Sequence, residues 1–490
     1  MTYPFYPDLT PLPRFDASYW QPKPRPKLAN ALRNAVAGEV IAPGDVGWDQ
    51  ARAAWHLVVD QHPAAVVRVA DADDVAATVK VARDLGVPVS PQPGGHGATG
   101  SPKSTVDGTI VLRTEALDEI HVSRYTSRLR VGAGVRWGRA LAALDGTETL
   151  ALAGSSAGTS VVGYSVGGGL SWFSRRYGYA AHSVRALDIV DANGKQCRVT
   201  ADEDPDLFWA LRGGGGDFAV VTAIETELYP APTLFGGSLI YSGEQLHRVW
   251  DAYLQVTRCA PEELSVWLRL ANLPNLPFIP EPMRGRLATA VYFTYVGDPE
   301  RGERLIAPLR RAARRLVENV GPFSISQLGA IADEPSDPVP ASLGAVLLDD
   351  LGAEVQDIVA AAVTAPGTPI NLLALRHLGG ALRRSSVADG AAGTVDEPYL
   401  LMAAGIGPSA DALVGVPRDI DRLLGDLSGH HRGRVPFNFS DRLDPADSLP
   451  EATLTRLRAI KRERDPDGLI RSNRPVLGAM TVTPDDVAGI

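Results

Sequence analysis

The sequence has little cysteine and no long apolar run. Its 490 residues include two cysteines, Cys197 and Cys259, which show no metal-ligand spacing and are too few for a disulfide framework. No stretch approaches the roughly 18 consecutive apolar residues of a transmembrane helix. The first residues also lack a basic region followed by an apolar run, as a secretory signal would require. These absences predict a cytoplasmic protein without a membrane span.

Positive charge is also scarce. The 48 Lys and Arg residues against 57 Asp and Glu give a net charge of −9 at pH 7, whereas nucleic acids and anionic membranes select a concentrated basic surface. The strongest basic cluster, 310–315, is expected on the solvated face of a helix over 303–320. We therefore expect no nucleic-acid or membrane partner. No metal site is expected either, because the pair His430-His431 lacks further ligands nearby.

Glycine, by contrast, is abundant and clustered. Three glycine-rich segments, 94–97, 154–170 and 212–218, are separated by strand-like sequence. Glycine turns bring backbone N–H groups close to an anionic ligand, because no Cβ keeps the ligand away. The first segment lies within 88–100 and leaves His96 free to reach such a ligand, although a tight turn with a solvated histidine is the alternative. The second is too rich in glycine and serine for a regular helix, and a flexible linker is its alternative.

The pattern of elements changes near Pro230-Ala231-Pro232. From there to about Pro436, helices such as 245–258 alternate with strands such as 264–270, 288–295 and 372–377, which indicates an α+β domain on an antiparallel sheet. A chain of this length exceeds one core. We therefore predict an arm (1–43), a first domain (44–230), a second domain (231–434) and a compact C-terminal tail (435–490). The proline-rich arm leaves room for a homodimer contact, and the loop 381–396 is a candidate mobile cover.

Seven short motifs follow one another in a recognisable order. They are Gly94-Gly95-His96, Gly163-Tyr164-Ser165-Val166-Gly167-Gly168-Gly169, Tyr177-Gly178, Arg212-Gly213-Gly214-Gly215-Gly216-Asp217-Phe218, Leu378-Gly379-Gly380-Ala381, Phe437-Asn438-Phe439, and Asp465-Pro466 with Asn473. Over roughly 44–475 the chain resembles the FAD-linked oxidoreductases of the vanillyl-alcohol-oxidase type. Within them it resembles the berberine-bridge-enzyme-like branch, which includes amine-oxidising and antibiotic-tailoring members.

The resemblance implies a fold, a cofactor and a set of residues around it. The fold is α+β, with a two-part FAD-binding domain (44–230 and 435–490) and an inserted substrate domain whose antiparallel sheet is covered by helices. His96 would carry FAD covalently, and an imidazole substituent makes the flavin a stronger hydride acceptor. The implied FAD-binding residues are Gln92, Pro93, Gly94, Gly95, His96, Gly97, Ser156, Gly158, Thr159, Val161, Gly163, Tyr164, Ser165, Gly168, Gly169, Val220, Asn438 and Asn473.

Two positions depart from the family's pattern. Ser156 stands where many relatives have a second, cysteine attachment, so the resemblance implies a single bond through His96. Phe437 stands where many relatives have a tyrosine that accepts the substrate's proton, and phenylalanine cannot act as a base. Either another group removes the proton, or the substrate is an amine that loses its proton to solvent. Asn438 is expected near the flavin edge.

The candidate catalytic residues are Phe437, Asn438, Tyr292 and His377. Trp267, Arg269, Tyr295 and Arg376 are further candidates on the substrate side. Because Arg376 and His377 are adjacent on a strand, only one of them points at the ligand. The expected function is an FAD-dependent oxidase that takes a hydride from a small-molecule alcohol or amine and passes electrons to dioxygen, giving peroxide. The alternatives are a flavin dehydrogenase, an oxygenating or rearranging enzyme of secondary metabolism, and a flavoprotein without activity.

Overall fold

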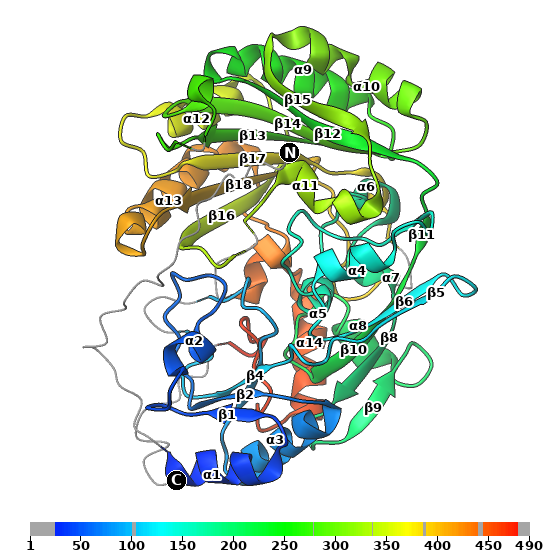
Figure 1. The fold of residues 1–490 in the computed structure, drawn as a ribbon, viewed down its shortest axis with the longest axis vertical. Helices are drawn as coiled ribbons and strands as arrows, with labels where there is room; N and C mark the ends of the chain where they lie inside the picture. The colour runs from blue at the N-terminus through cyan, green and yellow to red at the C-terminus, as the bar shows by residue number, and fades with distance from the viewer. Residues whose placement is uncertain are drawn as a thin grey trace.

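In the computed structural model of the protein, two β-sheet bodies lie one above the other along the long axis (Figure 1). The structure describes residues 25–99, 104–277, 279–335, 337–385, 389–439 and 444–478. Residues 1–24 of the predicted arm, Gly100, 386–388 of the predicted cover loop and 479–490 of the predicted C-terminal tail lie outside the described residues. The α+β fold class is confirmed by the mixture of helices with largely antiparallel sheets.

The lower body begins with a four-stranded sheet. Its strands, in spatial order, are β1 (Glu39–Ile41), β2 (Ala65–Arg68), β4 (Ile110–Arg113) and β3 (Val89–Pro91). The last three are parallel, and β1 is antiparallel at the edge. Helices α1 (Pro26–Ala35) and α3 (Ala72–Asp84) cover one face, and α2 (Trp48–Arg52) packs on the other. Asp71 caps α3 by accepting a hydrogen bond from the Asp74 amide at 3.0 Å.

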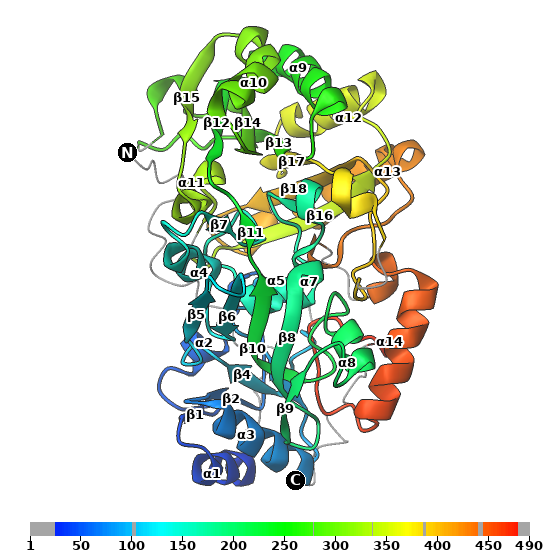
Figure 2. The same cartoon turned by 90° about the vertical axis from the view of Figure 1, so that its right-hand side faces the viewer.

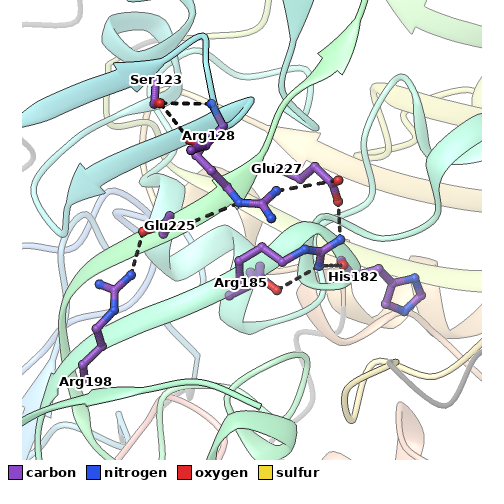
Figure 3. Close-up of polar contacts among 9 residues, drawn as sticks. Ser123, Arg128, His182, Arg185, Arg198, Glu225 and Glu227 are labelled. Carbon is purple, nitrogen blue, oxygen red and sulfur yellow. Dashed lines mark hydrogen bonds and ion pairs between the residues drawn. The ribbon is translucent and has the colours of Figure 1, made fainter. Parts of the chain in front are cut away.

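A second sheet in the lower body is antiparallel throughout. Its order is β5 (Ile120–Ser123), β6 (Arg128–Gly132), β10 (Val220–Glu227), β8 (Val184–Val190) and β9 (Gln196–Val199). One face is apolar, and the other carries charged side chains that pair across the strands. Figure 3 shows three of these arginines beside Glu225 and Glu227, with Arg198 Nη2 2.6 Å from Glu225 Oε2. Exposed ion pairs contribute about 0–1 kcal/mol each to the free energy of folding, so this charged face adds little stability. Its cross-strand pairs of opposite charge do favour the observed pairing of the strands.

Short elements connect these strands and form the top of the lower body. They are α4 (Trp137–Ala143), β7 (Thr149–Leu150), α5 (Val161–Val166), α6 (Ser174–Tyr177), α7 (Ala180–Ser183), α8 (Pro205–Ala210) and β11 (Tyr229–Pro230), which pairs with β7. Helix α5 lies inside the glycine-rich segment 154–170, so the expectation of no helix there is wrong. The Ser160 hydroxyl accepts a hydrogen bond from the Gly163 amide at 3.3 Å, and buried valines anchor the helix.

The upper body is a seven-stranded antiparallel sheet. Its order is β15 (Arg315–Pro322), β12 (Leu234–Ser242), β14 (Leu287–Val296), β13 (Leu264–Asn272), β17 (Leu372–His377), β18 (Tyr399–Ile406) and β16 (Ala341–Leu348). One face packs against α9 (Leu246–Cys259), α10 (Pro299–Ala312), α12 (Ala353–Thr364) and α13 (Val416–Asp426). The opposite face, called here the inner face, is turned toward the lower body, with α11 (Gly329–Ala332) beside it (Figures 1 and 2).

The predicted helix over 303–320 is wrong in its second half. Helix α10 ends at Ala312, the next residue is extended (φ −163°, ψ 171°), and β15 then pairs with β12. Arg310 donates to Glu303 at 2.9 Å and also contacts Glu318 on the strand. The arginine run therefore spans a helix-to-strand turn. The edge strand could not be predicted from this polar sequence, because a half-exposed edge strand shows little hydrophobic periodicity.

The predicted cover loop is bonded to the lower body in its described residues. The Ala391 amide donates to the Trp209 carbonyl at 3.1 Å, and the Ala392 amide donates to the Arg212 carbonyl at 3.0 Å. Leu382 and Val395 are buried in one small apolar cluster. The described part of 381–396 thus packs as a fixed connection, and its small side chains fit the close approach of these backbones.

The chain finally returns to the lower body through α14 (Glu451–Arg464), which runs beside α8 and the second sheet (Figure 2). Residues 469–476, called here the return segment, then pair with β3. The Val89 amide donates to the Leu469 carbonyl at 2.7 Å, and the Arg471 amide donates to the Val89 carbonyl at 2.8 Å. The lower body is therefore built from two distant parts of the sequence.

Buried charges hold the return segment. Asp217 accepts hydrogen bonds from the Ser472 and Val476 amides, and Asp465 accepts from the Leu469 and Ile470 amides, at 2.8–3.1 Å. The Lys461 ammonium lies 2.7 Å from Asp465 and also donates to the Ile470 carbonyl. The Lys461 and Asp465 side chains are only 3% and 1% exposed. Every group in this network thus has a partner, as burial of charge requires.

A helix that spans a lipid bilayer needs about 20 consecutive, mostly apolar residues. Among the described residues, none of the helices combines the length and the apolar character of a membrane span.

Replacing Asp465 with alanine should lower the free energy of unfolding by about 3–5 kcal/mol, because Lys461 would keep a buried charge without its partner. Denaturant unfolding followed by tryptophan fluorescence measures the change. Asp467→Ala is the control, since Asp467 is exposed two residues away and should change stability by less than about 0.5 kcal/mol. Equal losses in the two variants would contradict the anchoring role.

Candidate active site

A cavity of about 370 Å³ lies between the lower body and the inner face of the upper sheet. Four stretches of the lower body line it: residues 90–98, parts of 154–167, Gly215 and Gly216, and 471–474 of the return segment. The upper sheet adds Arg269, Leu343, Leu372, Arg376, Met402, Ala404 and Ile406. The cavity therefore collects segments that are hundreds of residues apart in the sequence.

His96 stands in the wall of this cavity. Its ring stacks on Trp55, with centroids 4.1 Å apart and planes 13° apart, and its Nε2 is buried without a hydrogen-bond partner among the described residues. Burial, and to a smaller extent the charges of Arg136 and His56, lower the pKa of His96 to about 3. The imidazole is therefore neutral near pH 7, with a lone pair on one ring nitrogen.

The backbone around His96 requires glycine. Gly95 has φ +82°, and a Cβ there would lie 2.9 Å from Ala54. The Gly94 carbonyl accepts a hydrogen bond from the Trp55 amide at 3.1 Å. The loop is thus pressed onto residues 54–56, which also supply the ring that stacks on His96. From the other side, Asn473 of the return segment donates to the Gly97 carbonyl, and the Thr99 hydroxyl donates to the Asn473 carbonyl at 2.7 Å.

The Phe437-Asn438-Phe439 motif forms a short 3₁₀ turn at the cavity wall. The Asn438 side-chain amide donates to the Tyr164 carbonyl at 2.8 Å. Gly167 lies so close that a Cβ there would be 1.9 Å from Asn438 Oδ1. This contact explains a glycine of the second cluster: the chain can pass the asparagine only without a side chain.

The structure brings most of the predicted FAD-binding residues to one cavity. Those that line it are Gln92, Pro93, Gly94, Gly95, His96, Gly97, Ser156, Thr159, Gly163, Tyr164, Asn438 and Asn473. Gly158, Val161, Ser165, Gly168, Gly169 and Val220 do not line it. Gly168 and Gly169 instead accept hydrogen bonds from Ala181 and Ala180 at 2.9 Å. Val220 points to the opposite side of its strand from Ala219 and Val221, which do line the cavity.

Strand alternation decides which candidate catalytic residues reach the cavity. On β17, Arg376 is on the inner face, and His377 is on the helix-covered face, where Arg175 Nη1 lies 2.9 Å from its Nε2. The placement of His377 as a catalytic residue is therefore not supported. Tyr292 is on the inner face but lies beneath Arg269, whose guanidinium is 4.7 Å from its ring. Tyr295 packs among the helices, and Phe437 lines the cavity.

Several residues that line the cavity were not predicted from the sequence. Glu334 supplies its carboxylate, held by Ser155 Oγ at 2.8 Å and Arg269 Nη2 at 3.2 Å. Arg471 and Arg474 come from the return segment, and Trp55 supports His96. Glu334 belongs to a loop without a motif, so no signal in the sequence marked it. The cavity-lining residues thus include four arginines, Arg269, Arg376, Arg471 and Arg474, and this one carboxylate.

The cavity fits a ligand that carries polar and anionic groups. Several buried polar atoms of its lining residues lack hydrogen-bond partners among the described residues, and Ser90 Oγ, Gln92 Oε1, His96 Nε2 and Ser156 Oγ are among them. Buried polar atoms normally have partners, so a ligand is their natural complement. The described residues contain no group of three His, Cys, Asp or Glu side chains that could hold a metal ion.

Comparison with known proteins identifies this ligand's class. Residues 63–200 match the family of FAD binding domains. (R)-6-hydroxynicotine oxidase of Paenarthrobacter nicotinovorans is 35% identical over 206 residues, which span 42% of this chain and 44% of that protein. The curated match therefore covers less than half of its relative.

Two solved structures show the same fold over nearly the whole chain. 6-Hydroxy-D-nicotine oxidase from Arthrobacter nicotinovorans has a TM-score of 0.77 at 24% identity, covering 89% of this chain and 97% of that one. Glucooligosaccharide oxidase from Acremonium strictum, with a 6-S-cysteinyl, 8α-N1-histidyl FAD, has a TM-score of 0.76 at 20% identity, covering 92% and 98%. At these identities the structures establish the fold, and with the domain match they confirm the family resemblance.

Replacing His96 with glutamine should make the flavin-free protein less sensitive to acid. An unfolded histidine titrates near 6.5, whereas folded His96 has a pKa of about 3. Between these values the unfolded chain binds the proton first, so stability is lost as pH falls from about 6.5 toward 3, by at most about 1.4 kcal/mol per pH unit. His96→Gln removes this contribution to the slope.

Denaturant unfolding at pH 7, 6 and 5 measures the slope, on protein from cells starved of riboflavin. His121→Gln is the control, because His121 is exposed on β5. If the wild type and His96→Gln lose stability in parallel, His96 is not held neutral by its surroundings.

Proposed function

We propose, from the premise that this chain belongs to the FAD-linked oxidoreductases of the vanillyl-alcohol-oxidase type, that it is an oxidase of a small-molecule alcohol or amine. When bound, FAD would supply two-electron redox chemistry, in which a substrate C–H is oxidised and dioxygen is reduced to hydrogen peroxide. The lower body, 44–230 with 435–490, would hold the FAD, and the inserted domain, 231–434, would present the substrate. The residues of this chain bind, orient and shield these partners.

The observation that carries the proposal is the environment of His96. Its neutral ring lines the cavity and is stacked on Trp55, and its Nε2 has no hydrogen-bond partner among the described residues. Only the neutral imidazole has a lone pair that can form a bond to carbon, and the low pKa of His96 keeps that form available. We therefore propose that His96 holds FAD covalently.

We propose a single attachment because none of the residues that line the cavity with His96 is a cysteine. Ser156 is in the wall, and its hydroxyl is buried without a partner among the described residues. Cys197 lies on β9, and Cys259 is exposed at the end of α9. Neither cysteine lines the cavity. A serine is a far weaker nucleophile than a thiolate at neutral pH, so it is not expected to form a second bond.

The other lower-body residues that line the cavity suit an extended anionic cofactor. The glycine segments bring backbone close to the ligand, and Arg471 and Arg474 add positive charge from the return segment. Asn438 and Asn473 are each fixed by a hydrogen bond to the backbone of another cavity-lining segment. We propose that these groups bind FAD and keep it oriented, with Asn438 near the flavin edge.

Among the described residues of the substrate side, Phe437 cannot act as a base, because it cannot accept a proton. Both carboxylate oxygens of Glu334 are already engaged, one by Arg269 and the other by Ser155. An amine that reaches the site already deprotonated needs no such group. This favours an amine over an alcohol, and the relative named for oxidising 6-hydroxynicotine is compatible with that choice.

The setting of the protein is also a proposal. Cys197 and Cys259 are unpaired with each other, which is compatible with a reducing, cytoplasmic compartment. A homodimer contact through the N-terminal arm remains a prediction, because most of that arm lies outside the described residues.

His96→Ala should abolish covalent flavin while the fold persists. The purified wild type should be yellow and should stay yellow after acid precipitation, whereas the variant should release its FAD into the supernatant. Its peroxide formation should be slower, since a flavin without the imidazole substituent accepts a hydride less readily.

The matched control is His121→Ala, a histidine on the exposed surface of β5. It should retain covalent colour. A wild-type protein that is colourless and takes up no FAD would overturn the proposed function.

A peroxide-release screen over secondary amines, alcohols and sugars identifies the reaction. For any hit, reduction without oxygen followed by rapid mixing with air separates the alternatives. Fast reoxidation with stoichiometric peroxide supports an oxidase, and slow reoxidation identifies a dehydrogenase. Oxygen incorporated into the product identifies an oxygenating enzyme.

A further inference from the structure

Arg376 is a buried cation in the wall of the cavity. It lies on the inner face of β17, and the residue is 4% exposed. Its guanidinium is 4.0 Å from the ring centre of Trp267 and 4.8 Å from that of Phe439. Trp267 in turn stacks on Trp172, with centroids 3.4 Å apart. Cation–π contacts with these rings thus hold the guanidinium in place, and its N–H groups are left available for polar partners.

The polar partners of Arg376 are distant. Its Nη2 is 3.5 Å from Ser155 Oγ and 3.8 Å from Glu334 Oε1, and its Nε has no partner among the described residues. Charge-assisted hydrogen bonds of a guanidinium are usually about 2.7–2.9 Å long. These polar contacts of Arg376 are therefore longer than a usual charge-assisted hydrogen bond.

Glu334 does not supply a closer acceptor. One of its oxygens accepts from Ser155 at 2.8 Å, and the other lies 3.2 Å from Arg269 Nη2. The single carboxylate is thus shared between two arginines and lies closer to Arg269. The cluster of Arg269, Glu334 and Arg376 carries one net positive charge. Burial lowers the pKa of Arg376 to about 10, so it remains a cation at neutral pH.

We propose that Arg376 binds a carboxylate of the substrate. This inference rests on the proposed function, because it concerns the molecule oxidised in the same cavity. A buried charge is costly unless it is paired, and the planar fork of arginine matches a carboxylate. Leu372, Met402 and Ala404 line the same wall and would contact an apolar body. The predicted substrate class is a small amine or alcohol that carries a carboxylate on an apolar frame.

Arg376 differs in position from the arginines assigned to FAD. Arg471 and Arg474 come from the return segment of the lower body, whereas Arg376 and Arg269 come from the upper sheet. The two pairs are therefore carried by opposite walls of the cavity. This separation assigns Arg376 to the substrate and makes it a specificity-determining residue.

The first test compares benzoate with benzamide, which have similar shapes and differ in charge. Each is titrated into the purified full-length protein, and tryptophan fluorescence is followed because Trp267 contacts Arg376. Benzoate should bind at least roughly tenfold more tightly, the ratio expected for one good hydrogen bond to a charged group. Equal affinities would overturn the proposal. So would inorganic phosphate or chloride competing as well as benzoate, which would make the site a general anion site.

Substitutions of Arg376 and of Glu334 should change the affinity for benzoate in opposite directions. Arg376→Met should weaken benzoate binding by roughly ten- to hundredfold and leave benzamide within about twofold. Arg376→Lys should restore part of the affinity, because lysine keeps the charge but lacks the fork. Glu334→Gln should strengthen benzoate binding, since it removes a competing carboxylate. A general loss of structure cannot produce this gain, so the pair remains informative even if Arg376→Met folds poorly.

Arg139→Met is the matched control, because Arg139 is exposed on α4 and pairs with Asp118. It should leave both ligands unaffected. Unchanged benzoate binding in folded Arg376→Met, or weaker binding in Glu334→Gln, would overturn the proposal. Flavin content is measured separately on each sample. A colourless protein that still prefers benzoate would refute the oxidase proposal while keeping the carboxylate site.

Discussion

The rest of the structure depends on the anchoring of the return segment by buried charge. Asp217 and Asp465 accept five contacts from this part of the chain, four from backbone amides and one from Lys461. These bonds fix residues 469–476 against β3, which places Asn473 on the Gly97 carbonyl. Residues 94–99 and the return segment are therefore bonded to each other in the wall of the cavity. Without this anchor, the cavity would lose the part of its wall that the return segment supplies.

A second constraint is the two-residue period of the upper sheet. It places Trp267, Arg269 and Arg376 on the inner face and commits His377 to the helix-covered side. The sheet can therefore present cations to the cavity while its other face packs against four helices. The lower body supplies the glycine backbone and His96. Each body would thus serve one partner of the proposed reaction, the lower body the FAD and the upper sheet the substrate.

The sequence predicted the parts of the site that have a local signature. The glycine turns and His96 could be recognised because tight backbone approach requires particular residues. The choice between Arg376 and His377 could not be made, since it depends on strand register relative to the lower body. Glu334 and Trp55 could not be predicted as site residues, because neither belongs to a recognisable local motif. The helix predicted over 303–320 failed where an exposed edge strand resembles a polar helix.

The central claim is that His96 alone bonds the flavin in the cavity between the two bodies. Mass spectrometry of proteolytic peptides from the purified, flavin-loaded protein tests it most directly. The peptide containing His96 should carry the mass of FAD, and the peptide containing Ser156 should be unmodified. An unmodified His96 peptide from flavin-loaded protein, or flavin attached at any other residue, would contradict it.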